Sequence, residues 1–130
     1  MRSVLEGVAY NSRWLLATVE KFTGRPFPWL HFIGGGAQSE LWCQIMADVL
    51  DREIRQVEHP IRANARGAAL LAGIALGRIT VDDLARHVRI LATFTPDRAH
   101  RAVYEDRYAE FRVLHKQTSR RTKRHARHGT

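Results

Sequence analysis

The first third of the chain carries apolar residues at two different spacings. Large apolar side chains recur every three or four positions over residues 4–22, which predicts an amphipathic helix that ends before Gly24 and Pro26. The apolar stripe of this helix consists of Val4, Val8, Leu15, Val19 and Phe22, with Leu5 and Leu16 widening it. A mostly apolar run follows over residues 29–33 and predicts a short buried strand.

The middle of the chain predicts a helix, a strand and a further helix. Residues 39–50 are helical in pattern, with Ser39 as the N-cap. The apolar side of this helix holds Leu41, Trp42, Ile45, Met46, Val49 and Leu50. Residues 54–57 predict a short, polar strand near a sheet edge. Asn64 is expected to cap the next helix, which runs to Gly77 and whose small residues are more typical of a core than of a binding site.

The last third continues the alternation. One helical turn is predicted at residues 82–85, an extended apolar segment at residues 88–94, and a final helix that starts at Pro96 and Asp97. The core-facing stripe of that helix consists of Tyr104, Tyr108, Phe111 and Leu114. Because helices and strands alternate, the chain belongs to the α/β class, although it is too short for a complete doubly wound enzyme.

Three consecutive glycines separate the predicted first strand from the second helix. Gly34, Gly35 and Gly36 lack Cβ atoms, so the backbone can turn sharply there and a flat ligand can approach closely. The helix that starts near Ser39 points free N–H groups toward the same space, which suits a nucleotide, although such glycines also serve turning alone. The Walker and G-x-G-x-x-G phosphate motifs are both absent, since no lysine follows and Gln38 and Ser39 replace the last glycine.

Composition separates the end of the chain from the rest. The 130 residues carry a net charge of +8, but the segment from Arg112 onward holds seven Lys or Arg and no acid. The remaining residues hold 14 basic and 13 acidic side chains. No window approaches the roughly 18 apolar residues of a membrane span, and the start lacks a secretory signal, which predicts a cytoplasmic protein. Cys43 is the single cysteine and no histidine pair has H-E-x-x-H spacing, so neither a disulfide nor a metal site is expected.

Three segments, in this order, resemble the C-terminal domain of the FGGY family of carbohydrate kinases, most closely its xylulokinase-like members. They are residues 4–10, residues 34–50 with the glycine loop, and residues 65–73 with the sequence Ala-Arg-Gly-Ala-Ala-Leu-Leu-Ala-Gly. Residues 93–97 and the tyrosine-bearing final helix also look like the end of that family's sequence. The resemblance therefore covers residues 4–115.

The resemblance implies a ribonuclease H-like, actin-type ATPase fold divided between two lobes, with ATP and Mg²⁺ bound between them. This chain then forms a partial C-terminal lobe with a mixed sheet and flanking helices over residues 1–116, followed by a basic disordered tail over residues 117–130. The same resemblance implies that the glycine loop packs against adenine and ribose and that Ser39 hydrogen-bonds the base. The nucleotide-binding residues implied in this way are Gly34, Gly35, Gly36, Ala37 and Ser39, with Gln38 a weaker candidate.

Three further residues and one segment bear on the comparison with the family. Gln44 and Asp48 match the family's second helix, where a structural role on a helix face is more typical than catalysis. Asp51 stands where the family commonly has glycine, which predicts a strained or altered turn because Asp adopts left-handed geometry less readily. The approach to the third helix, residues 61–64, lacks the acidic residue that is frequent in the family, which predicts altered polar contacts near the nucleotide.

The family's general base, first phosphate loop and sugar-binding residues come from upstream sequence that has no counterpart here. We therefore expect no catalytic residue, no sugar-kinase activity from this chain alone, and a weak affinity for adenine nucleotide. The first helix begins without a clear cap, which suggests a chain cut from a longer one. Val4, Val8, Trp14 and Leu15 then need partners, either from an N-terminal kinase lobe or through self-association.

An alternative function uses the basic end of the chain. Residues 116–128 contain six Lys or Arg and two His, enough for salt-dependent contact with phosphates. The alternative is therefore an interaction or nucleic-acid-binding module. A solvated terminal extension is the simpler interpretation, because the segment has no aromatic residue for base stacking.

Overall fold

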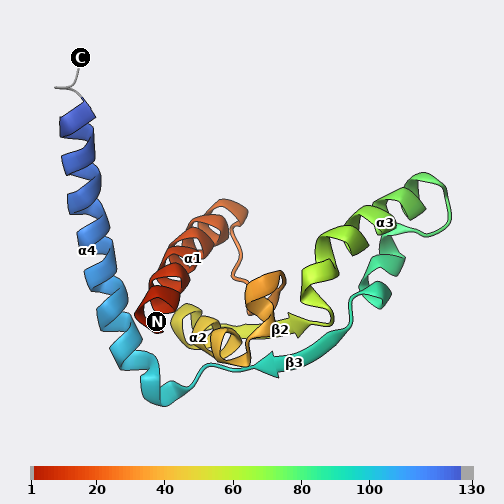
Figure 1. Ribbon diagram of the computed structural model, residues 1–130, viewed down its shortest axis with the longest axis horizontal. Helices are drawn as coiled ribbons and strands as arrows, with labels where there is room; N and C mark the ends of the chain where they lie inside the picture. The colour runs from red at the N-terminus through yellow and green to blue at the C-terminus, as the bar shows by residue number, and fades with distance from the viewer. Residues whose placement is uncertain (1, 127–130) are drawn as a thin grey trace.

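Three short, partly apolar segments form the central sheet of this protein, which we describe from a computed structural model (Figure 1). The structure describes the backbone of residues 2–126 and the side chains of residues 2–118. Strands β1 (Trp29–Phe32), β2 (Glu53–Val57) and β3 (Ile90–Phe94) lie in the order β1-β2-β3. β2 runs parallel to β1 and antiparallel to β3. The predicted α/β class with a mixed sheet and flanking helices is thereby confirmed.

β2 is the central strand, so the prediction of an edge strand is wrong. Its Ile54 pairs with Leu30 on one side and Phe94 on the other, and this face of the sheet packs against the helices. On the opposite face Arg55 forms an ion pair with Glu53 at 2.7 Å. The strand is polar in sequence because one face of it carries this ion pair while the other is buried.

β1 lies at the edge of the described sheet, so the prediction of a buried strand is also wrong. Its side chains alternate between the core and the surface, and Trp29 is 40% exposed. The Arg55 guanidinium lies 4.1 Å from the centre of the Trp29 ring, which places a cation–π contact on the open face of the sheet. Apolar composition identified the strand but not its position in the sheet.

Helix α2 (Glu40–Leu50) supplies most of the core. Its buried residues are Cys43, Ile45, Met46, Ala47, Asp48, Val49 and Leu50. Ser39 is the N-cap as predicted, since its Oγ accepts a hydrogen bond from the Trp42 N–H at 3.3 Å. Asp51 follows the helix in the left-handed conformation, with φ at 53°, and forms an ion pair with Arg101 at 2.9 Å. The turn predicted to be altered by Asp51 therefore keeps the geometry that glycine would favour.

Helix α1 (Arg2–Thr23) crosses α2 and packs on it with only one of its two apolar faces (Figure 1). Ala9 and Tyr10 are buried, and Leu5 and Leu16 pack against the core from the same side. The predicted stripe itself points away from the core: Val4, Val8, Leu15, Val19 and Phe22 are all exposed. The expectation that part of the stripe needs partners outside the chain stays a prediction.

Helix α3 (Ala63–Ala75) extends away from the sheet and buries none of its residues (Figure 1). The prediction of a core helix is therefore wrong, although its end at Gly77, with φ at 65°, is as expected. The helix starts after the short 3₁₀ helix η2 (Pro60–Arg62), with Arg62 and not Asn64 at the N-cap position. Small residues permit close packing, and a Cβ on Gly73 would lie 3.2 Å from Ile79, but no residue of this helix is buried.

A 3₁₀ helix, η3 (Val81–His87), and strand β3 lead to the C-terminal helix α4 (Arg101–Ala126), which follows the turn η4 (Arg98–His100). Tyr104 is buried and Tyr108 and Phe111 pack on the core as predicted, whereas Leu114 is exposed. The backbone stays helical to Ala126, where a disordered tail had been expected from residue 117. Lys, Arg and Gln favour helices and no Gly or Pro interrupts this stretch. Residues 127–130 and the side chains from residue 119 onward lie outside the described part, so the division at residue 116 stays a prediction.

Candidate functional site

The carboxyl ends of β1 and β2 meet at one edge of the sheet because the two strands are parallel. The loop after β1 contains the three glycines and the 3₁₀ helix η1 (Gly35–Gln38), and the loop after β2 contains η2. The Gly34 N–H donates to the Pro60 carbonyl at 2.9 Å and so joins the two loops. In open α/β sheets, crevices for ligands form at such an edge.

The three glycines have three different environments. Gly34 has φ at 85° and ψ at −173°, a region that side-chain-bearing residues rarely adopt. A Cβ on Gly36 would lie 3.1 Å from the Trp42 ring, so this glycine permits close packing between loop and helix. A Cβ on Gly35 would meet no atom within 4 Å. Of the three, only Gly35 faces open space without a structural constraint of its own.

Ala37 and Ser39, the other two predicted site residues, hold the loop in place. Ala37 is fully buried, and its carbonyl accepts hydrogen bonds from Gln56 Nε2 and, at 3.7 Å, from Cys43 Sγ. Burial raises the pKa of the Cys43 thiol, which suits a structural rather than a reactive cysteine. Ser39 caps α2. The structure therefore gives both residues a role in folding the loop.

A cavity of about 470 Å³ lies between the two loops and β3. Its lining residues are Gln38, Gln56, His59, Pro60, Ile61, Arg62 and Leu91. Of the candidates in the glycine loop, only Gln38, the weaker one, lines it. The volume is within the range of small-molecule sites, and apolar walls are combined with amide and cationic groups.

Sequence reasoning missed the contribution of the second loop. Residues 59–62 line the cavity, and a loop that follows the second of two parallel strands must reach the same edge as the first. His59 also has φ at 49°, one of two positive values among non-glycine residues in the described backbone. Left-handed backbone at a bulky residue is enriched at ligand sites. The prediction of parallel pairing between residues 29–33 and 54–57 would have located this loop.

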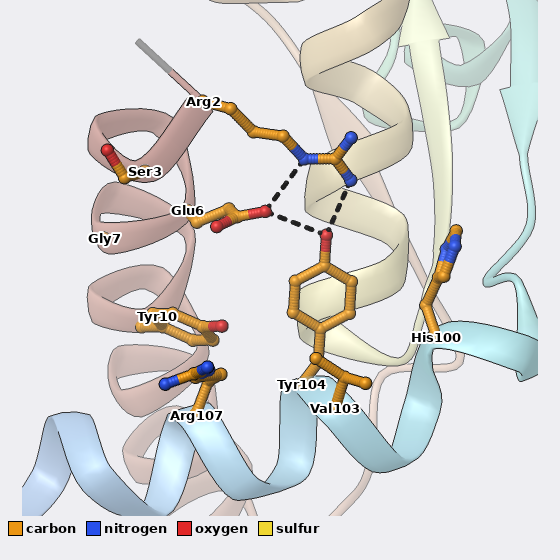
Figure 2. Close-up of a pocket in the computed structure, with 9 residues that line it drawn as sticks. All are labelled: Arg2, Ser3, Glu6, Gly7, Tyr10, His100, Val103, Tyr104 and Arg107. Atoms are coloured by element: carbon orange, nitrogen blue, oxygen red, sulfur yellow. Dashed lines mark hydrogen bonds and ion pairs between the residues drawn. The ribbon is translucent and has the colours of Figure 1, made fainter.

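A second cavity, of about 530 Å³, lies where α1 meets the start of α4 (Figure 2). Its lining residues are Arg2, Ser3, Glu6, Gly7, Tyr10, His100, Val103, Tyr104 and Arg107. The Tyr104 hydroxyl accepts a hydrogen bond from Arg2 Nη2 at 3.1 Å and donates one to Glu6 at 3.2 Å. Arg2 Nε also contacts Glu6 at 3.0 Å, which closes a triangle of polar groups.

The groups of this second cavity interact with one another. Burial, and then the nearby Glu6 carboxylate, raise the pKa of Tyr10 to about 12, and burial also raises the pKa of Tyr104. Both phenols therefore keep their protons near neutral pH. Tyr10 packs against the rings of Tyr104, Tyr108 and Phe111 at centroid distances of 5.8–6.3 Å. This region therefore packs α1 against α4.

Gln44 and Asp48 have the structural role expected for them. Gln44 Nε2 donates to Asp48 Oδ1 at 2.8 Å and to the Thr95 carbonyl at 2.9 Å. The same Asp48 oxygen accepts the Asp97 N–H at 2.9 Å, and His100 Nδ1 lies 3.5 Å from the other oxygen. These contacts fasten the segment between β3 and α4 onto α2, so the buried carboxylate is engaged in folding.

Within residues 2–118, whose side chains the structure describes, no three His, Cys, Asp or Glu side chains are grouped so as to hold a metal ion. Over the same residues no helix combines the length and the apolar character that crossing a bilayer demands.

Relatives of known name match most of this chain. A xylulose kinase of Staphylococcus epidermidis is 29% identical over 123 residues, which are 93% of this chain and 24% of that enzyme. An autoinducer-2 kinase of Klebsiella pneumoniae is 34% identical over 118 residues, 88% of this chain and 22% of that enzyme. The chain thus spans about a quarter of the length of the curated relatives it matches.

Solved structures and family models agree with these relatives. The crystal structure of xylulose kinase from Rhodospirillum rubrum superposes with a TM-score of 0.71 and 34% identity, over 89% of this chain and 24% of that one. Residues 1–76 match the model of the FGGY family of carbohydrate kinases, C-terminal domain. On the strength of that match, more than half of its length, this chain belongs to the FGGY family of carbohydrate kinases.

Proposed function

We propose that this chain is the adenine-nucleotide-binding portion of an ATP-dependent carbohydrate kinase of the xylulose kinase type, inactive by itself. The observation that carries the proposal is the cavity at the carboxyl edge of β1 and β2, next to the glycine loop. Family membership supplies the reaction class. The interaction module with a basic tail is not favoured by any observation on the described residues and stays an alternative prediction.

The chemistry of the cavity suits a purine nucleotide. Pro60, Ile61 and Leu91 offer apolar surface for a flat ring, and the Gln38 amide offers a donor and an acceptor for ring nitrogens. His59 and Arg62 are the groups that could contact phosphate oxygens. Open space beside Gly35 leaves room for a ligand to lie against the backbone.

The same cavity does not suit Mg²⁺ or the transfer step. Mg²⁺ prefers oxygen ligands, above all carboxylates, and the lining of the cavity contains no carboxylate. Phosphoryl transfer also needs a carboxylate base aligned with the acceptor hydroxyl. When bound in an intact enzyme, ATP supplies the γ-phosphoryl group and Mg²⁺ neutralises its charge. In this proposal those ligands and the base come from the part of the enzyme that this chain does not represent.

Nucleotide binding is tested by titrating ¹⁵N-labelled protein with ATP and following amide shifts by NMR. We expect a dissociation constant on the order of 1 mM, because one wall of the site is present. Shifts should concentrate at residues 34–38 and 59–62 and be absent around Tyr104. Gly35→Val should weaken binding at least about tenfold by filling ligand space, and Gly7→Ala, on α1, should not. Shifts centred on the second cavity, or none at 10-fold higher ATP, would refute the proposal.

Lack of activity is tested separately, with a coupled assay for ADP release. Purified protein is incubated with ATP, Mg²⁺ and D-xylulose, and an intact xylulose kinase serves as the positive control. We expect ADP release at the rate of the protein-free blank. Turnover at ordinary kinase rates, of about 1–100 per second, would show that the chain contains the catalytic machinery.

A further inference from the structure

Gln56 is a polar side chain buried at the inner wall of the cavity that follows β1 and β2. It is 4% exposed, lies on the central strand and lines the cavity together with Gln38 and the loop after β2. Glutamine is mostly found at the surface of proteins, because burying an amide costs free energy unless its polar atoms have partners. A buried amide at this place therefore calls for a partner at each of its two ends.

One end of the amide is held by the glycine loop. Gln56 Nε2 donates a hydrogen bond to the Ala37 carbonyl. A carbonyl oxygen only accepts, so the NH₂ group must face Ala37 and the amide cannot be turned by 180°. This contact fixes the other end as well, and Oε1 faces away from the Ala37 carbonyl.

The other end of the amide has no partner in the protein. Within residues 2–118, whose side chains the structure describes, no group donates a hydrogen bond to Gln56 Oε1. The oxygen is not sealed inside the protein either, because the buried side-chain atoms without a partner in this part of the chain are Trp42 Nε1 and Arg52 Nε. Since Gln56 lines the cavity, its Oε1 is an acceptor that is open to the occupant of the cavity.

The backbone of β2 fixes the position of this acceptor. Gln56 pairs with Phe32 of β1 and with Ala92 of β3, so neighbouring strands hold it on both sides. The pairing with β3 shifts register between Gln56 and Val57, and these two consecutive residues are both buried, which breaks the alternation of the strand. Such irregularities re-aim side chains and are frequent next to active sites. The irregular strand thus directs a rigidly held amide to the cavity.

The remaining groups of the cavity give a bound nucleotide its direction. The cationic side chains His59 and Arg62 are exposed, whereas Gln56 is buried. A nucleotide whose phosphates contact the exposed cationic groups therefore turns its neutral ring toward Gln56. An amide oxygen accepts from an N–H and repels another acceptor, so it favours a ring that carries an amino group.

We propose that Gln56 is a specificity-determining residue of this site, and that its Oε1 accepts a hydrogen bond from the 6-amino group of a purine nucleotide. The inference rests on the proposed function for the class of ligand and names the group by which that ligand is selected. A purine without the amino group displaces water from Oε1 without replacing its hydrogen bond, so it binds less tightly. A role in holding the glycine loop explains Nε2 but leaves the open acceptor unexplained.

The test compares two nucleotides that differ only in the amino group, ATP and purine riboside 5′-triphosphate. Each is titrated into the ¹⁵N-labelled full chain, and the shifts are followed by NMR. We expect purine riboside 5′-triphosphate to bind at least about fivefold more weakly than ATP. The side-chain NH₂ resonances of Gln56 should shift more with ATP, because a hydrogen bond at Oε1 polarises the amide.

Two matched variants assign the selectivity to one amide. Gln56→Leu should reduce the ratio of the two dissociation constants to less than about twofold. Gln38→Leu, which removes the other amide of the cavity, should keep the ratio at about fivefold or more. The ratio is informative because a loop displaced by loss of the contact between Gln56 and Ala37 weakens both nucleotides alike. Circular dichroism shows whether each variant is folded, and the comparison on the unsubstituted chain does not depend on either of them.

Equal dissociation constants for the two nucleotides in the unsubstituted chain would overturn the inference, while ATP-induced shifts at residues 34–38 and 59–62 would still support the proposed function. Selectivity that persists in Gln56→Leu, or that disappears in Gln38→Leu, would also overturn it. Weaker binding of 2′,3′-dideoxy-ATP that becomes equal to that of ATP in Gln56→Leu would assign Oε1 to the ribose instead. Absence of any ATP binding would overturn both proposals together.

Discussion

Helices α2 and α3 are similar in length and both rich in apolar residues, yet only one of them forms a core. α2 lies against the sheet and α1, and seven of its eleven residues are buried. α3 has thirteen residues and buries none. The difference is one of position: α2 connects two paired strands and must cross their face, whereas α3 leaves the sheet and returns to it through η3. Apolar composition thus shows that a helix needs another element to bury its apolar face, but it does not show which element does so.

The sharpest test of this comparison is a pair of truncations. Ile45→Ala on α2, at a position 1% exposed, should lower the free energy of unfolding by about 2–5 kcal/mol through lost burial and a cavity. Leu71→Ala on α3 should change it by less than about 0.5 kcal/mol. Urea denaturation followed by circular dichroism measures both. A large cost at Leu71 would mean that α3 is packed in solution and the contrast between the helices is false.

A smaller effect is expected where the glycine loop meets α2. Gly36→Ala should cost about 1–3 kcal/mol, because its new Cβ would press on the Trp42 ring. Gly35→Ala should be tolerated within about 0.5 kcal/mol, since open space surrounds that position. Thermal melts of the two variants, compared with the unsubstituted chain, separate a loop packed on α2 from one that only turns. Equal melting temperatures would exclude the packed loop.

The contacts of Asp48, which fasten the segment between β3 and α4 onto α2, offer a comparable test. Asp48→Ala should cost about 1–3 kcal/mol because it leaves the part-buried Asp97 N–H without its acceptor. Asp48→Asn keeps an acceptor oxygen and should lose less than half of that. The rate of hydrogen exchange of the Asp97 amide reports directly whether its hydrogen bond to Asp48 is formed. Unchanged exchange in Asp48→Ala would mean that this segment is held by other contacts.

The smallest expected effect is a pH dependence at the far end of α1. The Phe27 N–H, at 2.8 Å, lowers the pKa of Glu20 below its ordinary value near 4.5. Burial opposes this effect, and Arg52 adds to the lowering. A depressed pKa in the folded state stabilises the fold above pH 4.5, and this stability is lost as the pH falls through the lowered value. Glu20→Gln should therefore flatten the acid side of the stability profile. A profile unchanged by the substitution would show that Glu20 is not held in this way.

Much of the local structure was predictable from the sequence. The α1 pattern, the N-cap at Ser39 and the end of α3 at Gly77 depend on neighbours within a few residues, and the structure agrees with each. Positions in the sheet were not predictable in the same way. The polar sequence of β2 suggested an edge, because nothing local reveals that Glu53 and Arg55 pair with each other on one face.

At the candidate site, too, some features were predictable from neighbouring residues and others were not. Three glycines and a serine marked the loop after β1, and the structure explains Gly34, Gly36 and Ser39 through backbone geometry, packing and capping. The residues that line the neighbouring cavity come mostly from the loop after β2. Only the parallel pairing of two strands brings these loops together, and pairing partners are far apart in the sequence.

By itself the sequence determined the family, the α/β alternation and the ends of most helices, because periodicity, capping and short motifs act over a few neighbouring residues. The tertiary structure alone decided which apolar face of α1 is buried, that β2 is central, and that α3 buries none of its residues. Burial depends on which distant segments meet, and the periodic pattern of a helix identifies an apolar face without identifying the surface that will cover it.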